Sequence, residues 1–137
     1  SQALISDDEV PVGAVIVSSE NEVIASASNG RRGAHDPSGH AEILALRRAS
    51  AELATDRLVH VTLFVTMEPC IMCAGAIREA QISRVVFGAY RDKGAGGSMY
   101  DVLRDQRLGP VPEIVPAVLA DECADLVQEF FTKLRGD

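Results

Sequence analysis

The run VTLFVTMEPCIMCAGAIREAQISRVVFGA, residues 61–89, decides the fold. Its first residues are β-branched and apolar and predict a short buried strand over Val61–Thr66. Pro69 stands where a helix tends to begin, so a helix is expected over Cys70–Gln81. A second strand is expected over Arg84–Ala89. Strands that alternate with helices in this way predict a layered α/β fold with a partly parallel sheet.

The residues before this run predict a strand pair and a helix. Val12–Ser19 and Asn21–Ser28 are β-branched and partly alternating, with a polar break between them. Asn29–Gly39 is dense in Gly, Asn, Asp, Pro and Ser and is expected to be a loop. From His40 to about Leu53 the chain is rich in Ala, Leu, Arg and Glu, which favours a helix.

The residues after the run predict a smaller set of elements. Lys93–Ser98 (KGAGGS) is expected to be a loop, and Met99–Arg104 a short helical turn. Glu113–Leu119 predicts a final strand, and Pro116 within it favours the edge of the sheet. A last helix is expected from Asp121 onward. Its apolar stripe comprises Cys123, Leu126, Val127, Phe130, Phe131 and Leu134.

Composition indicates a soluble globular protein. The chain of 137 residues is 47% hydrophobic and 24% charged, and we expect residues 1–137 to form a single domain. No apolar run approaches the ~20 residues that span a bilayer. Three cysteines are too few for a disulfide scaffold, and no leader of the signal-peptide kind is evident, so a cytoplasmic setting is expected. The net charge of −7 disfavours nucleic acid unless a local basic patch overcomes it.

Cys70 and Cys73 carry the chemistry of the run. Residues three apart on a helix share a face, so both thiols can reach one ion. The pair alone fits a redox switch, half of a structural zinc site, or part of a catalytic zinc site. His40 also begins a helix, and helices that follow parallel strands begin at the same edge of a sheet. Three ligands leave the fourth position of a tetrahedral zinc to water, which favours a catalytic site. Cys123 is more consistent with a buried thiol of the core than with a fourth ligand.

Glu42 strengthens the catalytic interpretation. It lies two residues after His40, close enough to exchange a proton with a metal-activated water without ligating the metal. Either motif alone is weak, because His-x-Glu is common on solvated helix faces and Cys-x-x-Cys is ambiguous. Together, His-x-Glu and Pro-Cys-x-x-Cys form the pattern of zinc-dependent nucleobase deaminases.

The chain resembles the cytidine deaminase superfamily and, within it, the bacterial tRNA adenosine deaminases. The likeness runs through EVPVGAVIV (9–17), HDPSGHAEILALR (35–47), TLFVTMEPCIMCAGAI (62–77), RVVFGA (84–89) and VLADECADLVQEFF (118–131). It implies a three-layer α/β/α sandwich with a mixed five-stranded sheet. It also implies hydrolytic deamination of adenosine to inosine at the wobble position of a tRNA anticodon, by a homodimer with one zinc ion (Zn²⁺) per subunit.

The resemblance also implies roles for individual residues. His40, Cys70 and Cys73 would hold zinc, and Glu42 would transfer protons. Val10, Asn29 and Phe131 match positions expected to contact the nucleotide, and the backbone of Ala41 is expected to hold the base or the attacking oxygen. Asp92 is expected to supply the acidic contact of a loop that is about one residue shorter than in the family, where Arg91 occupies the ungapped position.

Two other functions stay open. A deaminase of a free base or nucleoside (guanine, cytosine or a modified purine) would use the same chemistry, and the acidic net charge favours it. A non-catalytic protein with a structural zinc ion would have no need of Glu42. A nucleic-acid enzyme would gather cations around the pocket mouth, and the candidates are Arg31, Arg32, Arg91, Lys93, Lys133 and Arg135.

Overall fold

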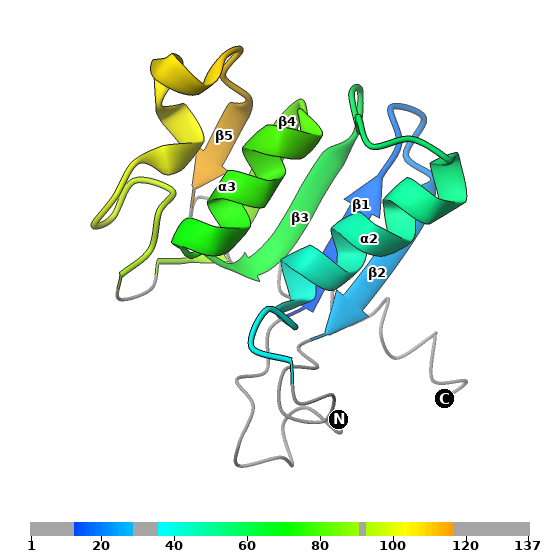
Figure 1. The fold of residues 1–137 in the computed structure, drawn as a ribbon, viewed down its shortest axis with the longest axis horizontal. Helices are drawn as coiled ribbons and strands as arrows, with labels where there is room; N and C mark the ends of the chain where they lie inside the picture. The colour runs from blue at the N-terminus through cyan, green and yellow to red at the C-terminus, as the bar shows by residue number, and fades with distance from the viewer. Residues whose placement is uncertain (1–12, 29–35, 91–92, 117–137) are drawn as a thin grey trace.

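The computed structural model describes residues 13–28, 36–90 and 93–116. Within them the chain forms five strands, two α-helices and two short 3₁₀ helices (Figure 1). The elements are β1 Gly13–Val17, β2 Val23–Ser28, α2 Ala41–Leu53, β3 Thr62–Met67, α3 Ile71–Ala80, β4 Arg84–Ala89, η1 Val102–Arg104, η2 Gln106–Leu108 and β5 Glu113–Pro116. The predicted strands and both predicted α-helices in this part of the chain are therefore confirmed, whereas the turn expected over Met99–Arg104 is helical only over Val102–Arg104. Residues 117–119 of the predicted final strand lie outside the described residues. The helix expected from Asp121 lies outside the described residues.

The strands form one mixed sheet in the order β2-β1-β3-β4-β5. β1 pairs antiparallel with both β2 and β3, whereas β3, β4 and β5 are parallel. The predicted mixed five-stranded sheet is confirmed. β5 lies at the edge, as expected from Pro116, which pairs with Phe87 of β4 and has no N–H to donate to a further strand.

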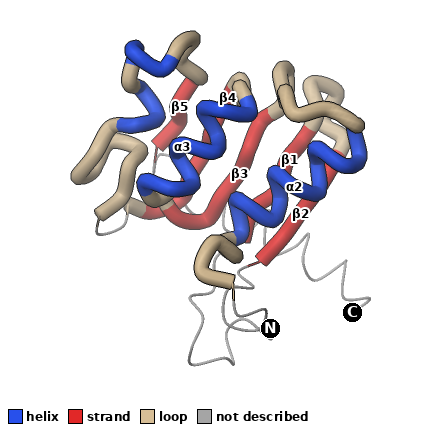
Figure 2. Tube along the Cα trace, in the orientation of Figure 1, coloured by secondary structure: helices blue, strands red, loops and turns tan. Residues whose placement is uncertain are grey.

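Both α-helices cover the same face of the sheet. α2 crosses β1 and β2, and α3 lies over β3 and β4 (Figures 1 and 2). The main hydrophobic cluster lies between the two helices and the sheet, and it includes Ala14 and Ile16 of β1. Val15 and Val17 alternate with these residues and pack with Phe64 in a second cluster on the opposite face. The last predicted helix, part of the expected third layer, is outside the described residues.

The strand directions bring the starts of both helices to one edge. β2 and β3 each run antiparallel to β1, so they point the same way, and the helices that follow them begin at the same end of the sheet. Figure 1 shows both starts at the lower edge of the sheet. Across the described residues, no helix has the length and apolar character that crossing a bilayer requires.

Candidate metal centre

His40 and Cys70 occupy equivalent places at the starts of α2 and α3. Each is the N-cap residue with extended backbone, and its carbonyl oxygen accepts the first helical hydrogen bond, from Leu44 or Ala74. Neither side chain makes the capping hydrogen bond of an N-cap Ser or Asp, although the backbone N–H groups of Met72 and Cys73 face the Cys70 sulfur and help to lower its pKa. Both side chains are therefore available to bind something else.

The loop before α2 fixes the backbone at His40. The Asp36 carboxylate accepts hydrogen bonds from the backbone N–H of Ser38 at 2.9 Å and from the Ser38 hydroxyl at 2.7 Å. These bonds hold the pKa of Asp36 below its usual value. The N–H of His40 then donates to the Ser38 carbonyl at 2.8 Å. The described end of the predicted loop, residues 36–39, is thus a defined turn that leads into the helix start at His40.

The three predicted ligands meet at one point. Nδ1 of His40 lies 3.6 Å from Sγ of Cys70 and 3.4 Å from Sγ of Cys73, and all three ligand atoms lie within 4.8 Å of one another. Zn–S bonds near 2.3 Å and Zn–N bonds near 2.05 Å at tetrahedral angles separate N from S by about 3.6 Å. The spacing and donor types therefore fit a tetrahedral zinc ion.

The two thiols differ in their acidity. The pKa of Cys70 falls from its ordinary 9.0 to about 5, chiefly because the Cys73 thiol hydrogen-bonds to it, while partial burial opposes the shift. The pKa of Cys73 rises because of that same bond, its burial and the negative charge of Glu42. A divalent cation replaces the shared proton and stabilises both sulfurs as thiolates.

Glu42 lies beside the ligands but is not one of them. It is in the first turn of α2, with only 2% of its surface exposed. Its charge is one cause of the raised pKa of Cys73, and its helix begins directly after the ligand His40. A carboxylate this deeply buried is stabilised by nearby positive charge, which a bound zinc ion supplies.

The arrangement leaves room for a catalytic metal. Within the described part of the chain, no further His, Cys, Asp or Glu joins the three ligands. Three protein ligands leave one coordination position for water or substrate. Ala41, the first residue of α2, is fully buried next to His40 in the chain. The other predicted nucleotide contacts lie outside the described residues: Val10, Asn29, Asp92 and Phe131.

The structure adds a buried carboxylate that the sequence did not point to. Glu68 is fully buried, two residues before Cys70, and accepts hydrogen bonds from Gly96 and Ser98. The glycine-rich run from Lys93 predicted a loop, but no pattern in one sequence links it to an acid 28 to 30 positions earlier.

Comparison with known proteins agrees with this site. Residues 1–89, which include all three ligands and Glu42, match the family described as "Cytidine and deoxycytidylate deaminase zinc-binding region". The tRNA-specific adenosine deaminase of Haemophilus influenzae is 43% identical over 130 residues, which cover 94% of this chain and 75% of that protein.

Two solved structures share the fold. One comes from studies of A-to-I editing by tRNA:A34 deaminases at the wobble position of transfer RNA. It has a TM-score of 0.78 and 38% identity and covers 86% of both chains. The guanine deaminase of Bacillus subtilis has a TM-score of 0.58 and 35% identity, and the match covers 67% of this chain and 58% of that one. The chain therefore belongs to the cytidine and deoxycytidylate deaminase family, in the group that includes the tRNA-specific adenosine deaminases.

Proposed function

We propose that this chain is a zinc-dependent enzyme that deaminates adenosine to inosine at the wobble position of a tRNA anticodon. The observation that carries the chemistry is the tetrahedral spacing of the His40, Cys70 and Cys73 ligand atoms beside the buried Glu42. The substrate is supported by the Haemophilus influenzae relative and by the tRNA:A34 deaminase structure.

In this proposal His40, Cys70 and Cys73 hold the metal and Glu42 moves the protons. When bound, zinc supplies a water nucleophile that is active near neutral pH. Glu42 accepts a proton from the attacking water and delivers it to N1 of adenine, while oxygen bonds to C6. Glu42 then passes the second proton of the water to the amino group, the C6–N6 bond breaks, and ammonia leaves. Adenosine and water thus give inosine and ammonia.

The nucleotide must leave its stack to reach this site. Unstacking a base costs a few kcal/mol and least in a single-stranded segment, which an anticodon loop provides. Ala41 begins the helix that carries Glu42, and we propose that its backbone N–H group contacts the base. The remaining contacts, Val10, Asn29, Asp92 and Phe131, are proposed from the family resemblance.

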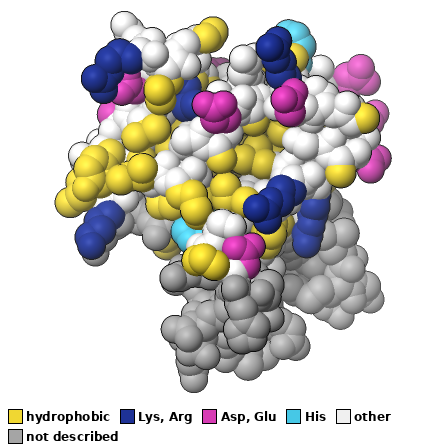
Figure 3. All heavy atoms as spheres, viewed as in Figure 1, with side chains coloured by type: hydrophobic (Ala, Val, Ile, Leu, Met, Phe, Trp, Pro, Cys, Tyr) yellow, Lys and Arg dark blue, Asp and Glu magenta, His cyan; other side chains and the backbone are white. Residues whose placement is uncertain are grey.

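We further propose that residues 1–137 act as one deaminase domain in a cytoplasmic homodimer. The described strands form one sheet with one main hydrophobic cluster, which supports a single domain. Hydrophobic side chains gather over α3 and the loop between β4 and η1 (Figure 3). Among them Ile71 is 51% exposed and Met99 60%, which favours a protein contact in this region.

A free-base substrate is the second candidate. The structural likeness to a guanine deaminase and the net charge of −7 favour it. The two differ in what they require: a free purine places no demand on surface charge, whereas an RNA loop needs cations near the site.

An ammonia-release assay on the zinc-loaded protein separates these functions. The substrates are an anticodon stem-loop with adenosine at the wobble position, the same stem-loop with guanosine there, free adenosine, guanine and cytidine. We expect turnover of the adenosine stem-loop alone. Release of ammonia from guanine or cytidine, with none from the adenosine stem-loop, would contradict the tRNA assignment.

A further inference from the structure

We propose that Glu68 is a positioning residue for the metal centre, which it serves by holding the loop Gly94–Ser98 against the turn that carries Cys70. The proposal rests on the proposed function in one respect, that the metal is zinc. In this proposal Glu68 neither binds the metal nor transfers a proton. It acts indirectly, by fixing the backbone of the loop and of the turn before Cys70.

The Glu68 carboxylate uses both oxygens to bind the loop. Oε2 accepts hydrogen bonds from the backbone N–H of Gly96 at 2.8 Å and of Ser98 at 3.0 Å. Oε1 accepts from the Ser98 hydroxyl at 2.6 Å. Leaving a buried donor or acceptor without its partner costs free energy, so these three bonds favour one position of the loop. Glu68 is fully buried, so these bonds face no competition from water.

The loop sequence is adapted to this contact. A Cβ on Gly94 would overlap the Glu68 carboxylate. A Cβ on Gly96 would lie 3.0 Å from the Phe87 ring and 3.1 Å from Cγ of Glu68, closer than side chains normally approach. The glycines thus allow the loop backbone to approach the carboxylate, and they account for part of the glycine-rich run.

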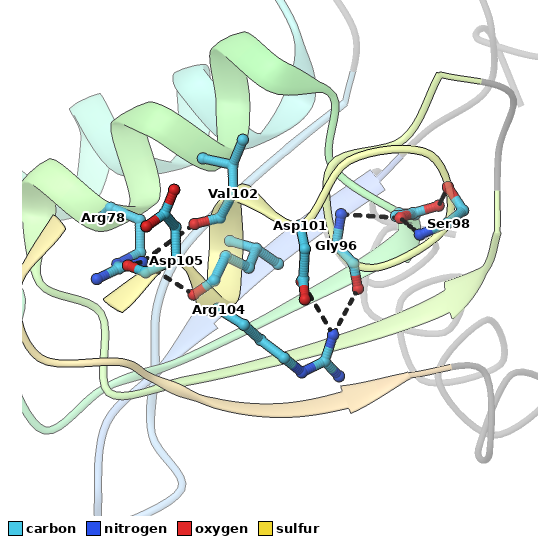
Figure 4. A network of polar contacts seen from close by, with 9 residues as sticks. Arg78, Gly96, Ser98, Asp101, Val102, Arg104 and Asp105 are labelled. Atoms are coloured by element: carbon cyan, nitrogen blue, oxygen red, sulfur yellow. Dashed lines mark hydrogen bonds and ion pairs between the residues drawn. The ribbon is translucent and has the colours of Figure 1, made fainter. Parts of the chain in front are cut away.

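Arg104 holds the loop from its other side. Its guanidinium donates to the Gly96 carbonyl at 3.0 Å and to the Asp101 carboxylate at 3.3 Å (Figure 4). The peptide groups on the two sides of Gly96 are therefore both bonded, the N–H to Glu68 and the C=O to Arg104. The position of the loop is therefore fixed by hydrogen bonds from polar side chains as well as by apolar packing.

The same contacts fix the turn before α3. The N–H of Glu68 donates to the Ala89 carbonyl at 2.7 Å, and the Pro69 carbonyl accepts from Ala95 at 2.8 Å. Cys70 follows directly as the N-cap of α3. The two residues before Cys70 are thus held by hydrogen bonds of the Glu68 N–H, the Pro69 carbonyl and the Glu68 carboxylate. Displacing the loop would release this turn and with it the direction of the Cys70 thiol.

Two substitutions of similar size separate positioning from charge. Glu68→Leu removes every acceptor, whereas Glu68→Gln keeps an oxygen for the two backbone N–H groups. Zinc affinity is measured by competition with a chromophoric chelator. Partners that orient metal ligands typically contribute ~10- to 100-fold in affinity. We expect E68L to bind zinc at least about tenfold more weakly and E68Q to stay within about threefold of the unchanged protein. Limited trypsin digestion should also cleave E68L faster at Lys93 or Arg104.

Val85→Ala is the control for a general loss of stability, because Val85 is fully buried in the same sheet and its side chain has no group that can form a hydrogen bond. It should leave zinc affinity unchanged. Ser98→Ala removes one of the three bonds and serves where E68L does not fold; it should weaken zinc binding by about two- to threefold.

Unchanged zinc affinity in E68L, or in S98A where E68L does not fold, would overturn the proposal, and so would equal losses in E68L and V85A. Equal losses in E68L and E68Q would overturn it too, since acceptor geometry would then not matter. None of these measurements needs a substrate. A protein that deaminates nothing in the assay above would still answer the question about Glu68.

Discussion

Glu42 is the residue whose replacement tests the chemistry most directly. It is almost completely buried, its charge raises the pKa of Cys73, and it is not one of the three ligands His40, Cys70 and Cys73. General acid–base catalysis contributes about 10²- to 10⁴-fold to a rate, so Glu42→Ala should lower kcat by that factor. The variant should retain one zinc ion per chain, because all three ligands remain. Single-turnover assays and metal analysis measure the two quantities.

Glu52→Ala is the matched control, the same substitution at an exposed position of the same helix. It should leave both kcat and zinc content unchanged. An E42A variant that still turns over substrate at the original rate would rule out the proton transfer assigned to Glu42.

At the residue scale, the sequence predicted the site residues that belong to a short motif, but it did not predict Glu68, which belongs to none. His40, Glu42, Cys70 and Cys73 were predicted because zinc chemistry requires those residue types at helix starts. Glu68 was not, because its role depends on loop residues far along the chain. A single Glu before Pro-Cys carries no pattern that distinguishes a buried acceptor from a surface acid.

At the scale of elements, one side chain of α3, that of Arg78, makes many hydrogen bonds to the segment after the loop. Arg78 is 7% exposed, and its guanidinium donates hydrogen bonds of 2.8–3.1 Å to five backbone carbonyls. The acceptors are Val102, Leu103, Asp105, Gly109 and Pro110. Arg78→Ala leaves several of them without a donor, so we expect a loss of about 2–4 kcal/mol in the free energy of unfolding. Urea denaturation of the zinc-loaded protein measures it.

Arg107→Ala provides the comparison, because the Arg107 side chain is 88% exposed and pairs only with nearby Asp105 in the described structure. The free energy of unfolding of this variant should not differ measurably from that of the unchanged protein, because a solvent-exposed ion pair contributes little. Equal losses for the two variants would show that the buried carbonyl contacts of Arg78 do not stabilise the fold.

The hydrogen bonds of Arg78 also show why some elements could be predicted from the sequence and others could not. β3, α3 and β4 follow hydrophobic periodicity and a proline, which are local features, and their predicted bounds agree with the structure within one or two residues. The turn expected over Met99–Arg104 is a 3₁₀ helix over Val102–Arg104 only, and η2 was not predicted. This region depends on tertiary hydrogen bonds from Arg78, and neither hydrophobic periodicity nor a capping residue in the local sequence indicates such bonds.

For the whole molecule, zinc should contribute to stability as well as to chemistry. His40 begins α2 and Cys70 begins α3, so one ion joins the two helices that cover the sheet face. Free zinc at about 1,000 times its Kd adds about 4 kcal/mol, which raises Tm by on the order of 10 °C for a domain of this size. Thermal melts with added zinc and with a chelator measure the shift. His40→Ala should lose most of this response; an unchanged Tm of the original protein after metal removal would contradict the prediction.

The net charge of −7 makes the salt dependence of the reaction decisive for the substrate. If long-range repulsion between the acidic chain and RNA dominates, added salt screens it and kcat/KM rises. If a local cluster of cations contacts phosphates, salt weakens binding instead. About three phosphate contacts on a single strand give a loss of roughly tenfold or more between 50 and 200 mM salt. We expect this fall for the adenosine stem-loop, measured as kcat/KM over a KCl series.

Guanine is the control: it carries no net charge, so any turnover of it would show little change with salt. A flat or rising kcat/KM for the stem-loop would exclude a basic rim and favour the free-base alternative.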